Sequence, residues 1–143
     1  MTVRIRRLRL ADHGDVVELL RRCGMTPRSR GRDSRPAFAR QLRTHRTTYL
    51  GAFAGDRLVG VVLGTHDTRK GWINRLAVHP EYRRQGVATR LVRTCERGLR
   101  AEGIEMFAAL IETGNAASKA LFRKLGYATG RLTYARKKLR PGI

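Results

Sequence analysis

The stretch from Val87 to Glu102 constrains the fold more than any other part of the chain. Its apolar residues recur at intervals of three or four positions, and Gly103 follows directly. This spacing places the apolar side chains on one face of an α-helix, and glycine commonly ends a helix. The stripe consists of Ala88, Leu91, Val92, Cys95 and Leu99. The sequence therefore predicts a long amphipathic helix whose apolar face is covered by another layer.

Several apolar runs on either side of this helix predict β-strands. The dipeptide Gly55-Asp56 separates two of them and is a hairpin signal. The run Met106–Ile111 is almost continuously apolar, which is typical of a strand covered on both faces. The predicted strands are Val3–Leu10, Thr48–Ala54, Arg57–Thr65, Gly71–Val78, Met106–Ile111, Tyr127–Thr129 and Thr133–Lys138.

Three further helices are predicted. The first has Asp12 as N-cap and ends at Gly24, and its apolar stripe is Val16, Leu19, Leu20 and Cys23. A short helix at Ala37–Thr44 follows a mobile loop at Thr26–Pro36, and the last helix runs from Asn115 to Gly126. This order of elements predicts an α/β domain in which a mixed sheet carries helices on both faces.

Charge and cysteine content narrow the function classes. The chain has 31 basic and 11 acidic residues and a net charge of +20, a field that attracts anions. Because the basic residues are scattered from Arg4 to Arg140, a solvated basic surface explains them better than a specific nucleic-acid site. The two cysteines, Cys23 and Cys95, lie on apolar helix faces and are expected to be buried free thiols rather than disulfide or metal ligands. The start of the sequence lacks the apolar stretch of a secretory signal, so we expect a cytoplasmic protein.

The segment Ala77–Thr89 carries the clearest chemical signal. A strand ends, a turn follows, and a helix opens on Gln85-Gly86-Val87-Ala88. Backbone N–H groups at a helix start lack intrahelical partners and bind anions, and Gly86 allows a phosphate to approach the backbone. Arg83 and Arg84 add positive charge. The segment has neither the glycines of a Rossmann fingerprint nor those of a Walker loop.

Two motifs together resemble the GNAT superfamily of N-acetyltransferases. Arg83–Ala88 matches its signature Arg/Gln-x-x-Gly-x-Gly/Ala, and Asn115–Tyr127 is similar to its closing motif, a helix that begins with Asn and ends in Leu-Gly-Phe or Leu-Gly-Tyr. The resemblance covers nearly the whole chain. It implies a single GNAT-type domain over residues 1–143, with a mixed, mostly antiparallel sheet, and acetyl-CoA as co-substrate. Dimers are common among proteins of this kind, so it also leaves a homodimer open.

The resemblance assigns residues to coenzyme A. Backbone N–H groups of Gln85, Gly86, Val87, Ala88 and Thr89 would hold the pyrophosphate, screened by Arg83 and Arg84. Backbone groups of Leu76, Ala77 and Val78 would pair with the pantetheine arm like an added strand, and one such amide would polarise the thioester carbonyl. On the closing helix, the residues expected near the coenzyme are Asn115, Lys119, Phe122 and Arg123. Asn115 is explained equally well as a helix N-cap, and Lys119 and Arg123 as solvated side chains.

Two positions depart from the family pattern. Phe122 occupies the place of a tyrosine that protonates the departing thiolate in many members, and Asn74 occupies the place of a glutamate base. Neither side chain can perform that proton transfer. Candidate substitutes are Asp67 and Glu112, with Tyr134 and His79 as weaker ones, although each is also an ordinary surface residue. Water, or catalysis by positioning alone, is the remaining alternative.

The favoured hypothesis is direct transfer of acetyl from acetyl-CoA to a primary amine on a small molecule, a protein N-terminus or a lysine. A second hypothesis is a coenzyme-binding module that has lost turnover, because Asn74 and Phe122 replace the usual catalytic groups. A third is association with nucleic acid or the ribosome through the high positive charge, which the low aromatic content of 6% disfavours for a base-stacking surface. No metal site and no membrane contact are expected. The sequence does not indicate which amine is the acceptor or what the oligomeric state is.

Overall fold

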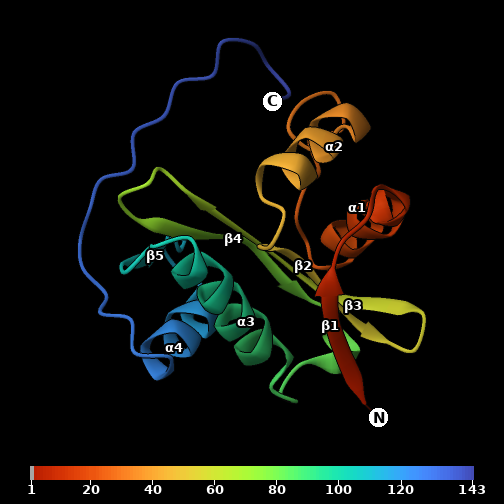
Figure 1. Ribbon diagram of the computed structural model, residues 1–143. Coiled ribbons are helices and arrows are strands. Elements are labelled where there is room, and N and C mark those ends of the chain that lie inside the picture. Colours follow the sequence, from red (N-terminus) through yellow and green to blue (C-terminus); the bar gives the residue numbers. More distant parts are fainter. Residues whose placement is uncertain (1) are drawn as a thin grey trace.

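An open five-stranded sheet forms the centre of the computed structural model, which describes residues 2–143 (Figure 1). The strands lie side by side in chain order; the first four are antiparallel to their neighbours, and the fifth pairs in parallel with the fourth. They are β1 (Val3–Arg7), β2 (Tyr49–Ala54), β3 (Arg57–His66), β4 (Gly71–Val78) and β5 (Phe107–Ala109). The predicted mixed, mostly antiparallel sheet is confirmed.

Helices cover both faces of this sheet, as predicted (Figure 1). α1 (His13–Arg22) and α2 (Arg35–Thr44) pack on one face, where Leu19, Leu20 and Phe38 join strand residues in one apolar core. α3 (Val87–Ala101) and α4 (Ala116–Lys124) contribute to a second core on the opposite face. Two short 3-10 turns, η1 (Leu10–Asp12) and η2 (Pro80–Tyr82), precede α1 and α3.

α3 is the best-buried helix and fixes the position of the site described below. Leu91, Val92, Cys95 and Leu99 of the predicted stripe are fully buried against the sheet. The close approach depends on Gly64 of β3, because a Cβ atom at that position would collide with the Cys95 thiol. The backbone of α3 is therefore held at a short, fixed separation from β3 and β4.

β4 contains an irregularity at Arg75. Its pairing with β3 shifts register between Val61 and Leu63, and Arg75 has a φ of 56°, a left-handed conformation that is rare for a residue with a side chain. Such an inserted residue bends the strand and redirects a side chain. Here the side chains of Asn74 and Arg75 both contact groups on the α1–α2 face of the sheet. In a regular strand, two successive side chains would point to opposite faces.

Two predictions about the last third of the chain are wrong. β5 is three residues long and only half buried, because among residues 2–143 β4 is its one neighbouring strand. The predicted strands Tyr127–Thr129 and Thr133–Lys138 have no regular secondary structure. Tyr127 is instead held against the helices, since its ring packs on Phe122 and its hydroxyl donates to Glu96. From there the chain passes outside the sheet toward α2 (Figure 1).

Three predictions about the first third need correction. Cys23 is half buried rather than buried, and its thiol donates to the carbonyl oxygen of Val78 at 3.3 Å. The segment Thr26–Pro36, predicted to be a mobile loop, is anchored by Asp33, which is 9% exposed and ion-paired with Arg75. Asp12 does precede α1, but its carboxylate accepts from Arg6 and from the amide of Arg9 instead of capping that helix. Within residues 2–143, no helix is long and apolar enough to cross a membrane.

Candidate active site

The start of α3 presents backbone amides without intrahelical acceptors. The first bond within the helix runs from the amide of Arg90 to the carbonyl of Gly86 at 3.1 Å, so the amides of Val87, Ala88 and Thr89 precede the ladder. Gly86, the N-cap, has a φ of 78° and no side chain to cap these amides. A Cβ atom built at Gly86 would meet nothing within 4 Å, so the space in front of the helix is open. We call these three amides and Gly86 the α3 amide site.

The loop before α3 supports the same site. Arg84 and Gly86 both have positive φ, and alternating backbone hands of this kind turn successive N–H groups toward one side, which favours an anion. Arg84 and Gln85 are exposed, and the Gln85 amide group donates to the carbonyl of Glu81 at 3.3 Å. The Arg83 side chain lies against the end of β4, because its Nε donates to the carbonyl of Val78 at 3.0 Å. The Arg83 side chain therefore caps the end of β4 in this state.

The second half of β4 has a free edge beside this site. β4 pairs with β5 only over Gly71–Ile73, whereas Ala77 and Val78 pair only with β3. Among the described residues, β5 does not pair with β4 beyond Ile73, so the strand edge at Leu76 and Ala77 is open to an extended chain, whereas the carbonyl of Val78 already accepts from Arg83 and Cys23. An arm that started at the α3 amide site would run along this edge from Val78 toward the bulge at Arg75.

The closing motif forms α4 as predicted. The side-chain oxygen of Asn115 accepts from the amide of Ser118 at 3.1 Å, which is the N-cap arrangement. Phe122 is 4% exposed and lies in the core beneath α3, edge to face with Tyr127. Lys119 is half buried, and the exposed Arg123 donates to the hydroxyl of Thr129 at 3.2 Å. These contacts explain Asn115 and Phe122 as structural residues of the helix.

The four acid or base candidates are not brought together. Asp67 lies in the turn between β3 and β4, at the opposite end of β4 from the α3 amide site, and accepts from the amides of Arg69 and Lys70 at 2.9 Å each. These hydrogen bonds lower the pKa of Asp67, which makes it a weaker base. Glu112 is exposed after β5, and Tyr134 is 66% exposed in the segment after α4.

Asn74 and His79 have structural partners. The Asn74 amide donates to the hydroxyl of Thr65 at 3.0 Å and to the carbonyl of Trp72 at 3.3 Å. His79 is buried, with Nδ1 accepting from the amide of Glu81 and Nε2 lying 3.0 Å from the guanidinium of Arg57. Burial and then Arg57 lower the pKa of His79, so the ring is neutral at physiological pH.

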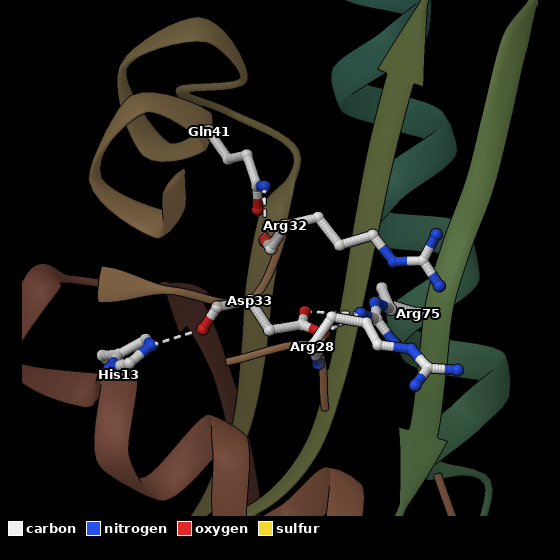
Figure 2. Close-up of polar contacts among 6 residues, drawn as sticks. All are labelled: His13, Arg28, Arg32, Asp33, Gln41 and Arg75. Carbon is white, nitrogen blue, oxygen red and sulfur yellow. Dashed lines mark hydrogen bonds and ion pairs between the residues drawn. The ribbon is translucent and has the colours of Figure 1, made fainter. Parts of the chain in front are cut away.

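Sequence reasoning missed a polar cluster where the α1–α2 loop meets β4 (Figure 2). Both carboxylate oxygens of Asp33 accept hydrogen bonds from Arg75. One of them also accepts from the amide of Arg28 at 2.5 Å. The carbonyl of Asp33 lies 2.8 Å from Nε2 of His13, which ties the loop to α1. No local motif predicts this cluster because its central pair is 42 residues apart. It fixes the α1–α2 loop over the middle of β4.

Tyr49 of β2 lies close to this cluster. Burial raises the pKa of Tyr49 to about 12, Arg75 opposes that rise, and Asp33 adds to it. The hydroxyl therefore stays protonated throughout the physiological range. Its ring packs edge to face on Phe38 of α2 with centroids 5.2 Å apart, so Tyr49 also joins the sheet to that helix.

Comparison with known proteins gives a consistent result. The sequence profile of the acetyltransferase (GNAT) family matches residues 14–127. An acetyltransferase of Photorhabdus laumondii is 30% identical over 123 residues, which cover 86% of this chain and 85% of that protein.

Solved structures share the fold. The PaiA N-acetyltransferase from Thermoplasma acidophilum, in complex with coenzyme A, superposes with a TM-score of 0.83 at 20% identity, covering 93% of this chain and 94% of that one. The ribosomal-protein-S18-alanine N-acetyltransferase from Escherichia coli has a TM-score of 0.75 at 20% identity, covering 91% and 80%. At such identities the likeness is one of architecture.

Proposed function

This chain belongs to the acetyltransferase (GNAT) family, whose members use acetyl-CoA, and from that premise we propose that it transfers acetyl from acetyl-CoA to a primary amine. The observation that carries the proposal is the pairing of the α3 amide site with the free edge of β4. The α3 amide site accepts the pyrophosphate, and the free edge of β4 accepts the pantetheine arm as an added strand. The tight packing of α3 on β3 keeps the two at a constant separation.

The chemistry needs little from acidic or basic side chains. The amine nitrogen attacks the thioester carbonyl, the C–N bond forms, the C–S bond breaks, and coenzyme A leaves as a thiol that takes up the proton lost by the amine. A backbone amide near the bulge of β4 polarises the carbonyl. We assign the proton transfers to water, because Asp67 is engaged in its turn and Phe122 and Asn74 cannot titrate. The rate then depends on the neutral fraction of the amine, which is small for a lysine with a pKa of about 10.4.

Substituting Gly86 tests the coenzyme site. Gly86→Glu introduces a side chain into the open space before α3, a negative charge where the diphosphate binds, and strain at a φ of 78°. We expect calorimetry to detect no coenzyme A binding by this variant, whereas the parent protein binds and releases free thiol with acetyl-CoA and an amine.

Gly55→Glu is the matched control. Gly55 also has positive φ, at 62°, and open space around it, but it lies in the β2–β3 turn. This variant carries the same strain and charge and should retain coenzyme binding. Equal affinity of Gly86→Glu and the parent would refute the assignment of the pyrophosphate. Tight binding by the parent without thiol release over a broad panel of amines would favour a binding module instead.

A further inference from the structure

The cluster under the α1–α2 loop has more positive than negative charge. The one carboxylate in it, Asp33, is already committed to Arg75 and to the amide of Arg28. Figure 2 shows the guanidinium groups of Arg28 and Arg32 extending from the loop to the same side as Arg75, beside β4. Among residues 2–143, Nε of Arg28 is buried and has no hydrogen-bond partner. A buried donor without a partner is destabilising, and a hydrogen bond to an oxyanion would satisfy it.

The segment after α4 adds more positive charge to the same place. Lys138 is half buried, and slight burial followed by the charges of Arg28, Arg136 and Arg32 lowers its pKa. Arg140 of the same segment donates to the carbonyl of Arg30 at 3.1 Å, so this part of the chain lies on the α1–α2 loop. Residues far apart in the sequence therefore bring their cationic groups together.

A pocket of about 380 Å³ adjoins this cluster between α2 and the segment after α4. Four of the residues that line it are arginines, none is an aspartate or glutamate, and Ile143 also lines it; the arginines are Arg30, Arg32, Arg40 and Arg140. Arg32 belongs to both the pocket lining and the cluster beside β4. A cationic molecule entering here would meet a repulsive field, whereas an anionic one would be attracted.

The position of the cluster relates it to the reaction. A pantetheine arm running from the α3 amide site along the edge of β4 ends near the bulge at Arg75, and Arg75 is ion-paired with the loop that carries Arg28 and Arg32. An amine that reaches the thioester from the α1–α2 face passes these guanidinium groups.

Resting on the proposed function, we propose that the acceptor is an amine that also carries an oxyanion, a carboxylate or a phosphate, and that Arg28 and Arg32 bind this group beside β4. Arginine suits the role because its planar donors match both oxyanions in a bidentate manner. Polyamines and other cationic amines are then poor acceptors. The nearby Asp33 fixes Arg75 and the loop, and is a positioning residue.

Matched small amines test the acceptor class. β-Alanine and 2-aminoethyl phosphate carry a carboxylate and a phosphate, ethanolamine is neutral at the same end, and ethylenediamine is cationic. We expect kcat/KM to be at least about tenfold higher for one or both anionic amines than for ethanolamine, as one charge-assisted hydrogen bond provides. Ethylenediamine should be the poorest. Comparing the two anionic amines identifies the preferred oxyanion, and an ethylenediamine rate equal to or above theirs overturns the proposal.

Two variants locate the effect. Arg32→Gln should raise KM for the preferred anionic amine about tenfold more than KM for ethanolamine or acetyl-CoA. Arg43→Gln, an equal loss of charge at an exposed position of α2 outside the pocket, should change none of these constants. If Arg32→Gln slows all four amines equally, or Arg43→Gln has the same effect as Arg32→Gln, the assignment is wrong.

A binding measurement keeps this test separate from that of the proposed function. Coenzyme A titration reports on the α3 amide site whether or not turnover occurs. Titration of β-alanine and of 2-aminoethyl phosphate into the protein, with and without coenzyme A, reports on the arginines. Binding that is lost in the double variant Arg28→Gln/Arg32→Gln, whose fold is checked by its unfolding curve, supports the oxyanion site even without acetyl transfer. Absence of binding by the parent protein refutes it even where coenzyme A binds.

Discussion

Cys23 and Cys95 differ in their surroundings although both are free thiols. Cys95 is buried against Gly64 under α3, and burial, followed by the charge of Glu96, raises its pKa to about 12. At pH 8 the Cys95 thiol is therefore protonated, and the thiolate is the reactive form. Cys23 is half buried at the end of α1.

A thiol titration checks this difference. In the native protein we expect Ellman's reagent to modify Cys23 and to spare Cys95 until denaturant is added. The Cys23→Ser variant should show almost no reaction before unfolding. Reaction of that variant at the rate of the parent protein would contradict the burial of Cys95.

At the scale of single residues, the sequence predicted local roles well and distant partners poorly. The N-cap of α4 at Asn115 and the open helix start at Gly86 follow from neighbours a few positions away. The ion pair between Asp33 and Arg75 could not be predicted, because no periodicity or spacing links a loop residue to a strand residue 42 positions later. Asn74 is similar, since its partner Thr65 depends on the register of β3 and β4.

At the scale of elements, the strands and helices with strong periodicity were predicted nearly to their ends. The helix predicted at Val87–Glu102 is α3, Val87–Ala101, and the strand Gly71–Val78 has those bounds. The last two predicted strands failed because alternation marks a segment able to form a strand but does not supply a partner edge. The bulge at Arg75 is a property of the β3–β4 pairing, which the amino-acid pattern does not reveal.

The ion pair between Asp33 and Arg75 ties the α1–α2 loop to β4, which gives a prediction for that element. In Asp33→Asn the guanidinium of Arg75, with its side chain only 18% exposed, loses its counter-charge. Removing one partner of a buried pair costs about 3–5 kcal/mol. We expect the free energy of unfolding in urea to fall by about that amount, and trypsin to cut the released loop after Arg28, Arg30 or Arg32 faster than in the parent protein.

Asp56→Asn is the control for Asp33→Asn. Asp56 is an exposed aspartate in the β2–β3 turn, and its loss changes the net charge equally. It should leave both the unfolding curve and the cleavage pattern unchanged. A stable Asp33→Asn protein with an uncut loop would show that other contacts hold the loop on β4.

At the scale of the whole molecule, the net charge of +20 gives the last prediction. Because the basic residues are spread over the sequence, their attraction to a polyanion is electrostatic and indifferent to base order. We expect fluorescence anisotropy to show binding of single-stranded oligonucleotides at low salt that weakens steeply with added salt and is equal for two scrambled sequences. A sequence preference that persists at physiological salt would point to a dedicated nucleic-acid site.

The ion pair between Asp33 and Arg75 joins the α1–α2 loop to β4, and we propose different functions for these two parts of the chain. In the proposed function, β4 and α3 bind acetyl-CoA, whereas the proposed recognition of the amine belongs to the α1–α2 loop and the segment after α4. Under this assignment, substitutions in the loop and in that last segment would change the preferred amine while leaving acetyl-CoA binding unchanged.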